Sequence, residues 1–245
     1  MFDVLGKYQA SLFVKSTEIV PSPDVISTLL KMFSDKELLP STFQEIGPQS
    51  LTPQVRLRLN SQNNEWGINF ATNRIDIEKN PVLPGGKNLG ELRDFVNDVK
   101  DFFSRILGQY KKKGNRLSLI TAGMLCEMTE EQLSGIYTKL FRPLPFYEGT
   151  MPFEWNQRCA SRYEKQIGSE IEQLNVITNI SRIKGQFVGL ERVTQFDRIE
   201  VNFDINTAAE NEENRFNIEM FDEFLFSAID VRSQIVEQIR GMING

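Results

Sequence analysis

The sequence predicts an α+β fold in which an antiparallel sheet carries long amphipathic helices on one face, with a helix at the C-terminus. Three observations predict it. Strand-like segments alternate apolar and polar residues and follow one another across short turns, which is typical of antiparallel sheets with one buried face. Segments with apolar residues every three or four positions, as in helices, stand between the groups of strands. No linker rich in Gly or Ser separates them.

The N-terminal part predicts a strand, a helix and a three-stranded meander. Residues 7–17 alternate apolar and polar side chains as a strand does. Ser22 before Pro23 is typical of a helix start, because the serine caps a free amide and proline needs no amide at the first helical position. Three prolines in the segment 38–53 end that helix. The stretch VRLRLNSQNNEWGINFATNRIDI, residues 55–77, then predicts three strands with a common apolar face.

Two helices and a strand are expected next. Asn88, with Glu91 three residues later, resembles a capping box at the start of a long helix, and Gly114 after three lysines predicts a left-handed cap at its end. A strand at 117–119 leads to a second helix with a capping box at Thr129. Paired phenylalanines widen the apolar arcs of the long helix and of the C-terminal helix. Such arcs indicate burial on two sides, by a second layer of the chain or by another subunit.

The order of elements divides the chain at a proline-rich break near 145–150. Residues 1–145 are predicted to run β-α-β-β-β-α-β-α. Residues 146–245 are predicted to contain a mixed segment, antiparallel strands and the C-terminal helix, and residues 146–168 allow either a helix or a twisted strand. The two parts are expected to share one core.

Composition excludes several kinds of chemistry. The 245 residues contain no histidine, which excludes Ser-His-Asp and Cys-His catalysis and histidine-ligated metal sites. The two cysteines, Cys126 and Cys159, cannot complete a tetrahedral zinc site by themselves, and we expect them as reduced thiols. We therefore expect a non-catalytic protein that needs no cofactor.

Charge and hydropathy predict a cytoplasmic protein. The net charge of -5 argues against a generic nucleic-acid binder and against binding to anionic membranes, because both need a surplus of Lys and Arg. No basic region followed by an apolar run is visible at the N-terminus, and no segment is long and apolar enough to cross a bilayer.

Four arginines are candidates for a binding surface on the polar side of the strands. Clustered arginines on a sheet bind carboxylates, phosphates or acidic partners, while alternating charge is also common on a sheet face that is only solvated. The candidates are Arg56, Arg58, Arg74 and Arg198.

Lys87 and Trp155 are the remaining binding candidates. Lys87 stands in PGGKN, which lacks the spacing and the Ser or Thr of a phosphate loop. An anion at the helix start and an ordinary glycine turn therefore both stay open. Trp155 is either a binding hot spot at the surface or part of the core.

Two carboxylates, Glu200 and Asp204, are the candidate metal ligands. They lie on one face of one strand with Cα atoms roughly 13 Å apart, too far to share a metal without a third group, which Asp197 could supply. A solvated sheet face is the alternative explanation.

Three segments resemble a sporadically distributed family of uncharacterised bacterial proteins of similar length. They are residues 7–34; the phrase EWGINFATNRIDI before a long helix and the strand RLSLI; and FDRIEVNFDINT before an acidic loop and a terminal helix ending IVEQIRG. Positions 81–88 depart from the family, because they lack its aromatic-rich phrase. The resemblance implies a bacterial, cytoplasmic, self-associating protein from mobile or defence-associated loci, and it carries over no catalytic residue.

The sequence thus predicts a homo-oligomeric interaction or scaffold component of a bacterial assembly, which binds protein partners in phage defence or toxin neutralisation. Two alternatives stay open. One is a metal-dependent phosphoesterase that uses Glu200 or Asp204, and the other is a nucleotide or small-anion sensor that binds near Arg56, Arg58 and Lys87.

Overall fold

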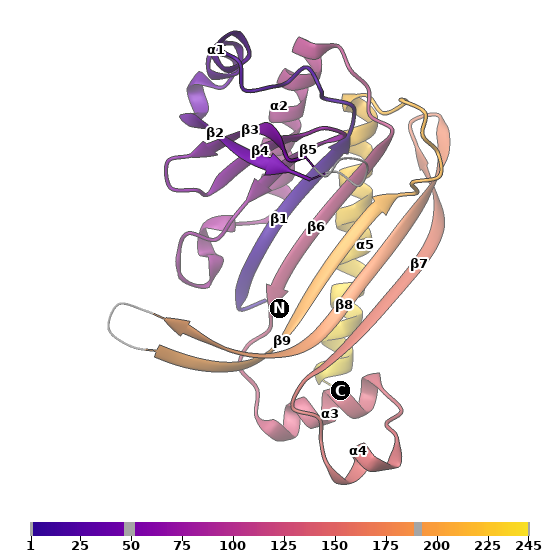
Figure 1. The fold of residues 1–245 in the computed structure, drawn as a ribbon. Coiled ribbons are helices and arrows are strands. Elements are labelled where there is room, and N and C mark those ends of the chain that lie inside the picture. The colour runs from indigo at the N-terminus through magenta and orange to yellow at the C-terminus, as the bar shows by residue number, and fades with distance from the viewer. Residues whose placement is uncertain (1, 47–51, 189–192, 245) are drawn as a thin grey trace.

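In the part of the chain that the structure describes, one antiparallel sheet of nine strands forms the body of the molecule (Figure 1). The computed structural model describes residues 2–46, 52–188 and 193–244. The strands lie in the order β2-β3-β4-β5-β1-β6-β9-β8-β7, so the first strand of the chain is central and β2 and β7 form the two edges. The predicted α+β class, with an antiparallel sheet, long helices on one face and a C-terminal helix, is confirmed.

Strands and helices follow one another in groups along the chain. The strands are β1 Val4–Phe13, β2 Leu38–Glu45, β3 Gln54–Ser61, β4 Trp66–Ala71, β5 Arg74–Lys79, β6 Arg116–Met124, β7 Trp155–Ile167, β8 Glu170–Val188 and β9 Val193–Thr207. The helices are α1 Pro23–Met32, α2 Leu92–Tyr110, α3 Glu130–Leu140, α4 Pro145–Gly149 and α5 Ile218–Asn244, with 3-10 turns η1 Ser34–Lys36 and η2 Pro84–Leu89. Among the described residues, none of the helices combines the length and the apolar character that crossing a membrane requires.

The N-terminal elements form where the sequence predicts them, with one addition. Ser22 caps α1 by accepting a hydrogen bond from the amide of Val25, and Pro23 is the first helical residue. The three strands of the meander are β3, β4 and β5. The addition is β2, in the segment predicted only as a break. Pro40 is tolerated there because β2 is an edge strand, where a missing amide hydrogen need not cost a ladder bond; Pro48 lies outside the described residues.

The start of α2 differs from the prediction. Asn88 does not cap this helix, because its side chain accepts hydrogen bonds from the amides of Val82 and Leu83 and so closes the loop around η2. The residue that precedes α2 is Glu91, and it makes no capping bond with its side chain. The asparagine that the capping-box pattern assigned to the helix therefore stabilises the preceding loop instead.

The end of α2 also differs from the prediction. Lys111 adopts the left-handed conformation, with φ 48° and ψ 48°, directly after the last helical residue. Gly114 is used for packing: it forms a β-bridge with Phe216, and a Cβ there would lie 2.3 Å from a methyl carbon of Leu12. The glycine is needed for the close approach of the chain to β1.

The capping box of α3 is confirmed, and the ambiguous segment is mostly a strand. Thr129 accepts a hydrogen bond from the amide of Gln132, and the Gln132 side chain accepts one from the amide of Thr129. Residues 146–168 contain most of α4 and then β7. The expected boundary at 145–150 coincides with α4, while the sheet itself runs unbroken from β6 through β9 and β8 to β7.

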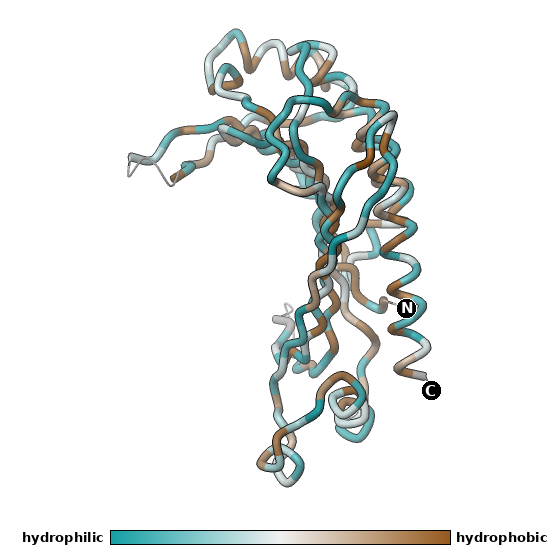
Figure 2. Tube along the Cα trace, turned by 90° about the vertical axis from the view of Figure 1, so that its right-hand side faces the viewer, coloured by the Kyte–Doolittle hydropathy of each residue, from teal (hydrophilic) through white to brown (hydrophobic). Residues whose placement is uncertain are grey.

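The helices α2 and α5 pack against each other and cover one face of the sheet (Figures 1 and 2). The ring centroids of Phe103 in α2 and Phe221 in α5 lie 4.7 Å apart between the two helices. Phe102, Phe103 and Phe224 are all buried, and only Phe226 of the phenylalanine pairs is partly exposed. Contacts with the sheet and with the neighbouring helix therefore account for the wide apolar arcs within one chain.

The topology contains the same arrangement twice. A central strand (β1 or β6) starts each unit, a helix follows (α1 or α3), and antiparallel strands then return toward the centre. The last of these strands (β5 or β9) pairs with the first, and a long helix (α2 or α5) ends the unit. Because β1 and β6 pair antiparallel, an approximate two-fold axis between them relates the two units. The extra elements are β2 in the first unit and α4 in the second.

A buried arginine ties the second unit together. Arg182 of β8 has 0% exposure, and its guanidinium donates to Asp197 at 3.0 and 2.7 Å, to Glu130 at 2.6 Å and to the carbonyl of Pro152 at 3.1 Å. These acceptors come from β9, α3 and the segment before β7. The hydrogen bonds from Arg182 hold the pKa of Asp197 below its ordinary value, so the carboxylate stays ionised at neutral pH.

Removing Asp197 should destabilise the fold far more than removing Glu130. Asp197→Ala leaves the buried guanidinium without its two-bond partner, and we expect a loss of about 2–3 kcal/mol in the free energy of unfolding, somewhat below the cost for a fully buried pair. Glu130→Ala should cost less than about 1 kcal/mol, because that side chain is mostly exposed. Urea denaturation of both variants measures the difference, and equal losses would contradict this ranking.

Candidate functional site

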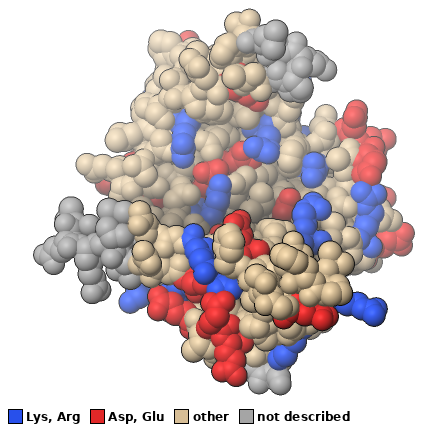
Figure 3. Space-filling model, turned by 60° about the horizontal axis from the view of Figure 1, so that its bottom comes forward, with Lys and Arg blue, Asp and Glu red and all other residues tan. Residues whose placement is uncertain are grey.

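One face of the sheet carries neither of the two long helices, and we call it the open face. Side chains alternate along each strand, so the residues that point away from α2 and α5 form a separate set. Figure 2 shows the sheet curving away from α5, which makes the open face concave. Basic and acidic side chains intermingle in the resulting hollow (Figure 3).

A row of polar residues crosses the whole open face, with one residue from each strand. Each residue is the register partner of the next across the strand pairs. From β2 to β7 this set, which we call the polar row, consists of Ser41, Arg58, Asn69, Asp76, Ser11, Ser118, Asn206, Asn175 and Arg162. One residue further along, the row on the helix side includes Leu57, Phe70, Ile75, Leu12 and Leu117.

Hydrogen bonds join the residues in the middle of the polar row. Ser11 donates to Asp76 at 2.6 Å. Ser118 and Asn206 both donate to Asp204, at 3.1 and 2.8 Å. Ser11 and Asn206 are each only 1% exposed although they point away from the long helices, so neighbouring side chains on the concave face cover them. The centre of the open face is therefore an ordered polar layer.

An aromatic ring contacted by two arginines lies beside the polar row. The guanidinium carbons of Arg74 and Arg116 lie 5.6 and 4.7 Å from the centroid of the Phe13 ring. Arg74 also donates to Asp76 at 2.9 Å, and Arg116 donates to Asn206 at 2.9 Å. Each guanidinium is thus held by the ring and by the polar row together, which fixes both positive charges at the rim of the hollow.

Asp76 is the buried carboxylate of the polar row. Burial raises its pKa above the ordinary value, and the hydrogen bonds from Ser11 and Arg74 only partly oppose that rise. Loss of solvent therefore outweighs the neighbouring positive charge at this position.

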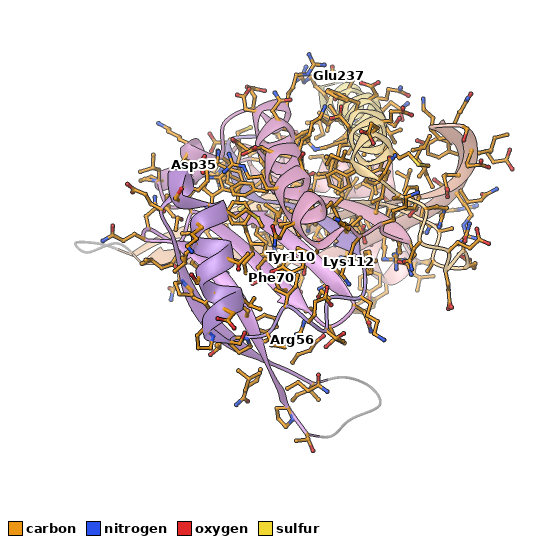
Figure 4. All side chains as sticks on the ribbon, turned by 90° about the horizontal axis from the view of Figure 1, so that it is seen from above. Asp35, Arg56, Phe70, Tyr110, Lys112 and Glu237 are labelled. Carbon is orange, nitrogen blue, oxygen red and sulfur yellow. The ribbon has the colours of Figure 1, made fainter. Side chains whose placement is uncertain are left out.

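Arg56 is placed inside the fold. It is 3% exposed and donates to the carbonyls of Phe70 and Ser16 at 3.0 and 2.8 Å. Figure 4 shows it close to Phe70. Burial lowers the pKa of Arg56. Alternation puts Arg56 on the same side of β3 as Arg58, but its hydrogen bonds link β3 with the segment that follows β1, so it is buried and supports the fold.

Arg58 is the predicted arginine with the least satisfied guanidinium. It belongs to the polar row, lies 3.9 Å from a carboxylate oxygen of Glu78, and has a buried Nε without a hydrogen-bond acceptor among the described residues. Its guanidinium passes over Gly67, where a Cβ would lie 3.1 Å from one terminal nitrogen. Arg58 and Arg74 therefore share the open face, as the sequence predicts.

Lys87 and Arg198 lie away from that pair of arginines. Lys87 is exposed in η2, a turn held against β1 because Gly86 approaches so closely that a Cβ would lie 2.0 Å from the Leu5 carbonyl oxygen. Arg198 donates to the carbonyl of Leu125 at 2.9 Å and to Glu127 at 3.2 Å. Arg56 donates to Ser16 just after the C-terminal end of β1, while Lys87 lies near the N-terminal end of β1. The structure therefore does not bring Arg56 and Lys87 together.

Trp155 is buried at the floor of an aromatic groove. It is 7% exposed, its ring lies 5.5 Å from that of Phe141, and its Nε1 has no hydrogen-bond partner among the described residues. The groove, of about 460 Å³, is also lined by Phe146, Tyr147 and Phe153, which are exposed. Of the two interpretations left open for Trp155, the structure supports core packing.

The candidate metal ligands do not converge. Asp204 accepts from Ser118 and Asn206, and Glu200 accepts from Asn202 at 2.9 Å. Asp197, the possible third ligand, lies on the other face of β9 and accepts hydrogen bonds from Arg182. In the part of the chain that the structure describes, no group of three or more Cys, Asp or Glu side chains is placed to hold a metal ion.

Comparison with known proteins finds no family model, no curated protein and no solved structure that matches this chain.

Sequence reasoning did not find the centre of the open face. Ser11, Ser118 and Asn206 are each ordinary polar residues of a strand, and nothing in their immediate neighbours marks them. The signal lies in the strand register, which aligns them with Asp76 across three strand pairs. The alternation of each strand does place them on the polar side, but only the pairing order makes them one site.

The raised pKa of Asp76 predicts a pH dependence of stability. A carboxyl whose folded pKa lies above its unfolded value, about 3.9, contributes stability that is complete at lower pH and is lost as pH rises through the folded pKa. We expect Asp76→Asn, which cannot ionise, to gain stability relative to the wild-type chain as pH rises from about 4 toward neutrality. Urea midpoints of both proteins across this range measure the change, and a relative loss would show that Arg74 dominates.

Proposed function

We propose that this chain is a non-catalytic interaction component whose open face binds a partner protein. The observation that supports the proposal is the polar row on a concave sheet face that the long helices leave uncovered. A partner strand, loop or helix laid across the strands would meet donors and acceptors from every strand in turn.

The composition of the open face favours a protein as the partner. Arg and aromatic side chains are enriched in protein interfaces, and here Arg74 and Arg116 are fixed against Phe13. Preordered side chains lose little conformational entropy on binding, so more of the contact energy appears as affinity. The Nε of Arg58, which has no acceptor among the described residues, adds a buried donor whose desolvation is costly until it is paired.

The charges of the open face are mixed in sign. Lys7 and Arg58 both lie near Glu78, and Arg74 is paired with Asp76. A nucleic-acid surface needs an excess of positive charge over the phosphate track, whereas mixed charge suits a polar protein surface with complementary groups. The setting in a bacterial assembly, in phage defence or toxin neutralisation, rests on the resemblance alone and is part of the proposal.

The test is capture of the partner from the host cell with matched charge variants. Lys7→Gln/Arg58→Gln removes two positive charges from the open face, and Lys31→Gln/Arg93→Gln removes two from the exposed sides of α1 and α2. We expect the open-face variant to bind the identified partner roughly tenfold more weakly, as for interface arginines in general, and the helix variant to bind like wild type. Binding is then measured with the purified partner.

Two outcomes would overturn this proposal. Equal binding by both variants would move the interface away from the open face. Thermal stabilisation of the purified chain by nucleotides or inorganic phosphate, lost in Arg58→Ala, would support the anion sensor instead.

A further inference from the structure

The strand β7 is a long edge strand of the sheet, and its central residues are exposed. It is the last strand in the order and, among the described strands, pairs only with β8, in an unbroken register from Trp155 with Arg182 to Ile167 with Glu170. Residues 158–162 are exposed on both faces of the strand. An edge of this kind presents a row of unpaired amide and carbonyl groups to any strand that can align with it.

The two edges of the sheet are built differently. β2 is shorter and contains Pro40, which cannot donate to another strand and is a common means of blocking an edge. β7 has thirteen residues, no proline and no bulge in its pairing with β8. Only β7 therefore keeps the regular backbone that pairing with a further strand requires.

The sequence of β7 is complementary to itself when two copies run antiparallel about Ser161. All thirteen residues then overlap, and Arg158 lies opposite Glu164 of the second copy, twice in the pair. The remaining facing pairs are Trp155 with Ile167, Asn156 with Gln166, Gln157 with Lys165, Cys159 with Tyr163, Ala160 with Arg162, and Ser161 with itself. Opposite charges directly across an antiparallel pair stabilise it, and like charges destabilise it.

Neighbouring registers are unfavourable. A shift of one step in one direction places Arg162 opposite itself, and a shift in the other direction places Arg158 opposite Arg162. The charges that would make β7 soluble as a free edge thus also select one self-pairing over its neighbours.

The two charged residues are available for this pairing. Arg158 is exposed and makes no hydrogen bond or ion pair with the described residues, and Glu164 is exposed with one acceptor oxygen occupied by Gln173. The same register places the exposed Phe153, which precedes β7, at the level of the β7–β8 turn of the second copy, near which Ile171 is exposed. Apolar contact at both ends of the β7–β7 pairing would add to its stability.

We propose that two copies of this chain form a dimer by antiparallel pairing of β7 about Ser161. This pairing, related by a two-fold axis perpendicular to the sheet, would join the two sheets into one and leave both open faces on the same side. The dimer does not depend on the proposed function of the open face, and it supplies a basis for self-association that the helices, whose apolar arcs are buried within one chain, do not.

Charge reversal at β7 tests the pairing. The wild-type chain of 28.2 kDa should sediment as a dimer at micromolar concentration. Arg158→Glu and Glu164→Arg each create two like-charge pairs, and we expect each to raise the dimer dissociation constant roughly tenfold. The double variant R158E/E164R restores opposite charges and should return the constant to near its wild-type value.

Cysteine cross-linking tests the register independently of charge. In a background with Cys126→Ser and Cys159→Ser, Ser161→Cys places two thiols across the axis, within the Cα separation that a disulfide requires, and should give a covalent dimer on mild oxidation. Glu164→Cys is the matched control, because its two copies would lie six residues apart in register, and it should stay monomeric on a denaturing gel.

Each result decides the proposal. Restoration by the double reversal, together with cross-linking at position 161 alone, supports it. A wild-type monomer at high micromolar concentration, a dimer indifferent to both reversals, or equal cross-linking at positions 161 and 164 would overturn it. None of these outcomes bears on partner capture by the open face, so the two proposals fail separately.

Discussion

The contact between one face of the sheet and the pair α2 and α5 is the interaction on which the rest of the structure depends. Burial of apolar area is the dominant favourable term in folding, and in this chain it is concentrated on one side of nine strands. Because side chains alternate along a strand, each apolar residue that faces the helices has neighbours in the strand that face the opposite side. The polar character of the open face follows from that geometry.

The open face nevertheless has more order than solvation alone requires. A solvated sheet face needs only polar residues in any arrangement. Here Ser11, Ser118 and Asn206 are buried and donate hydrogen bonds to the carboxylates of Asp76 and Asp204. Buried polar groups must be satisfied to be tolerated, and a satisfied network makes the surface rigid. A rigid, concave and polar surface is suited to recognition, because little of it has to be rearranged on contact.

Local patterns in the sequence predict most elements of this fold. The serine-proline start of α1, the capping box at Thr129 and the alternation in β3 to β5 act over a few residues, so they are readable without the tertiary structure. Asn88 and Gly114 were misassigned because each serves a contact outside its own helix. The residues of the open face were harder to predict from the sequence. Arg56 and Arg58 are two residues apart on one strand, but contacts with β4 and with the segment after β1 bury Arg56 and not Arg58.

The proline in β2 has a consequence for how far assembly can proceed. A molecule whose two edge strands could both pair would add copies at both edges and grow into an open ribbon without limit. A chain whose edge strand β2 is blocked by Pro40 can add a second copy only at β7. Once two copies have paired through β7, no open edge strand is left for a third copy. One residue at the far edge of the sheet would thus set the final stoichiometry and keep the joined sheets from growing into a fibre.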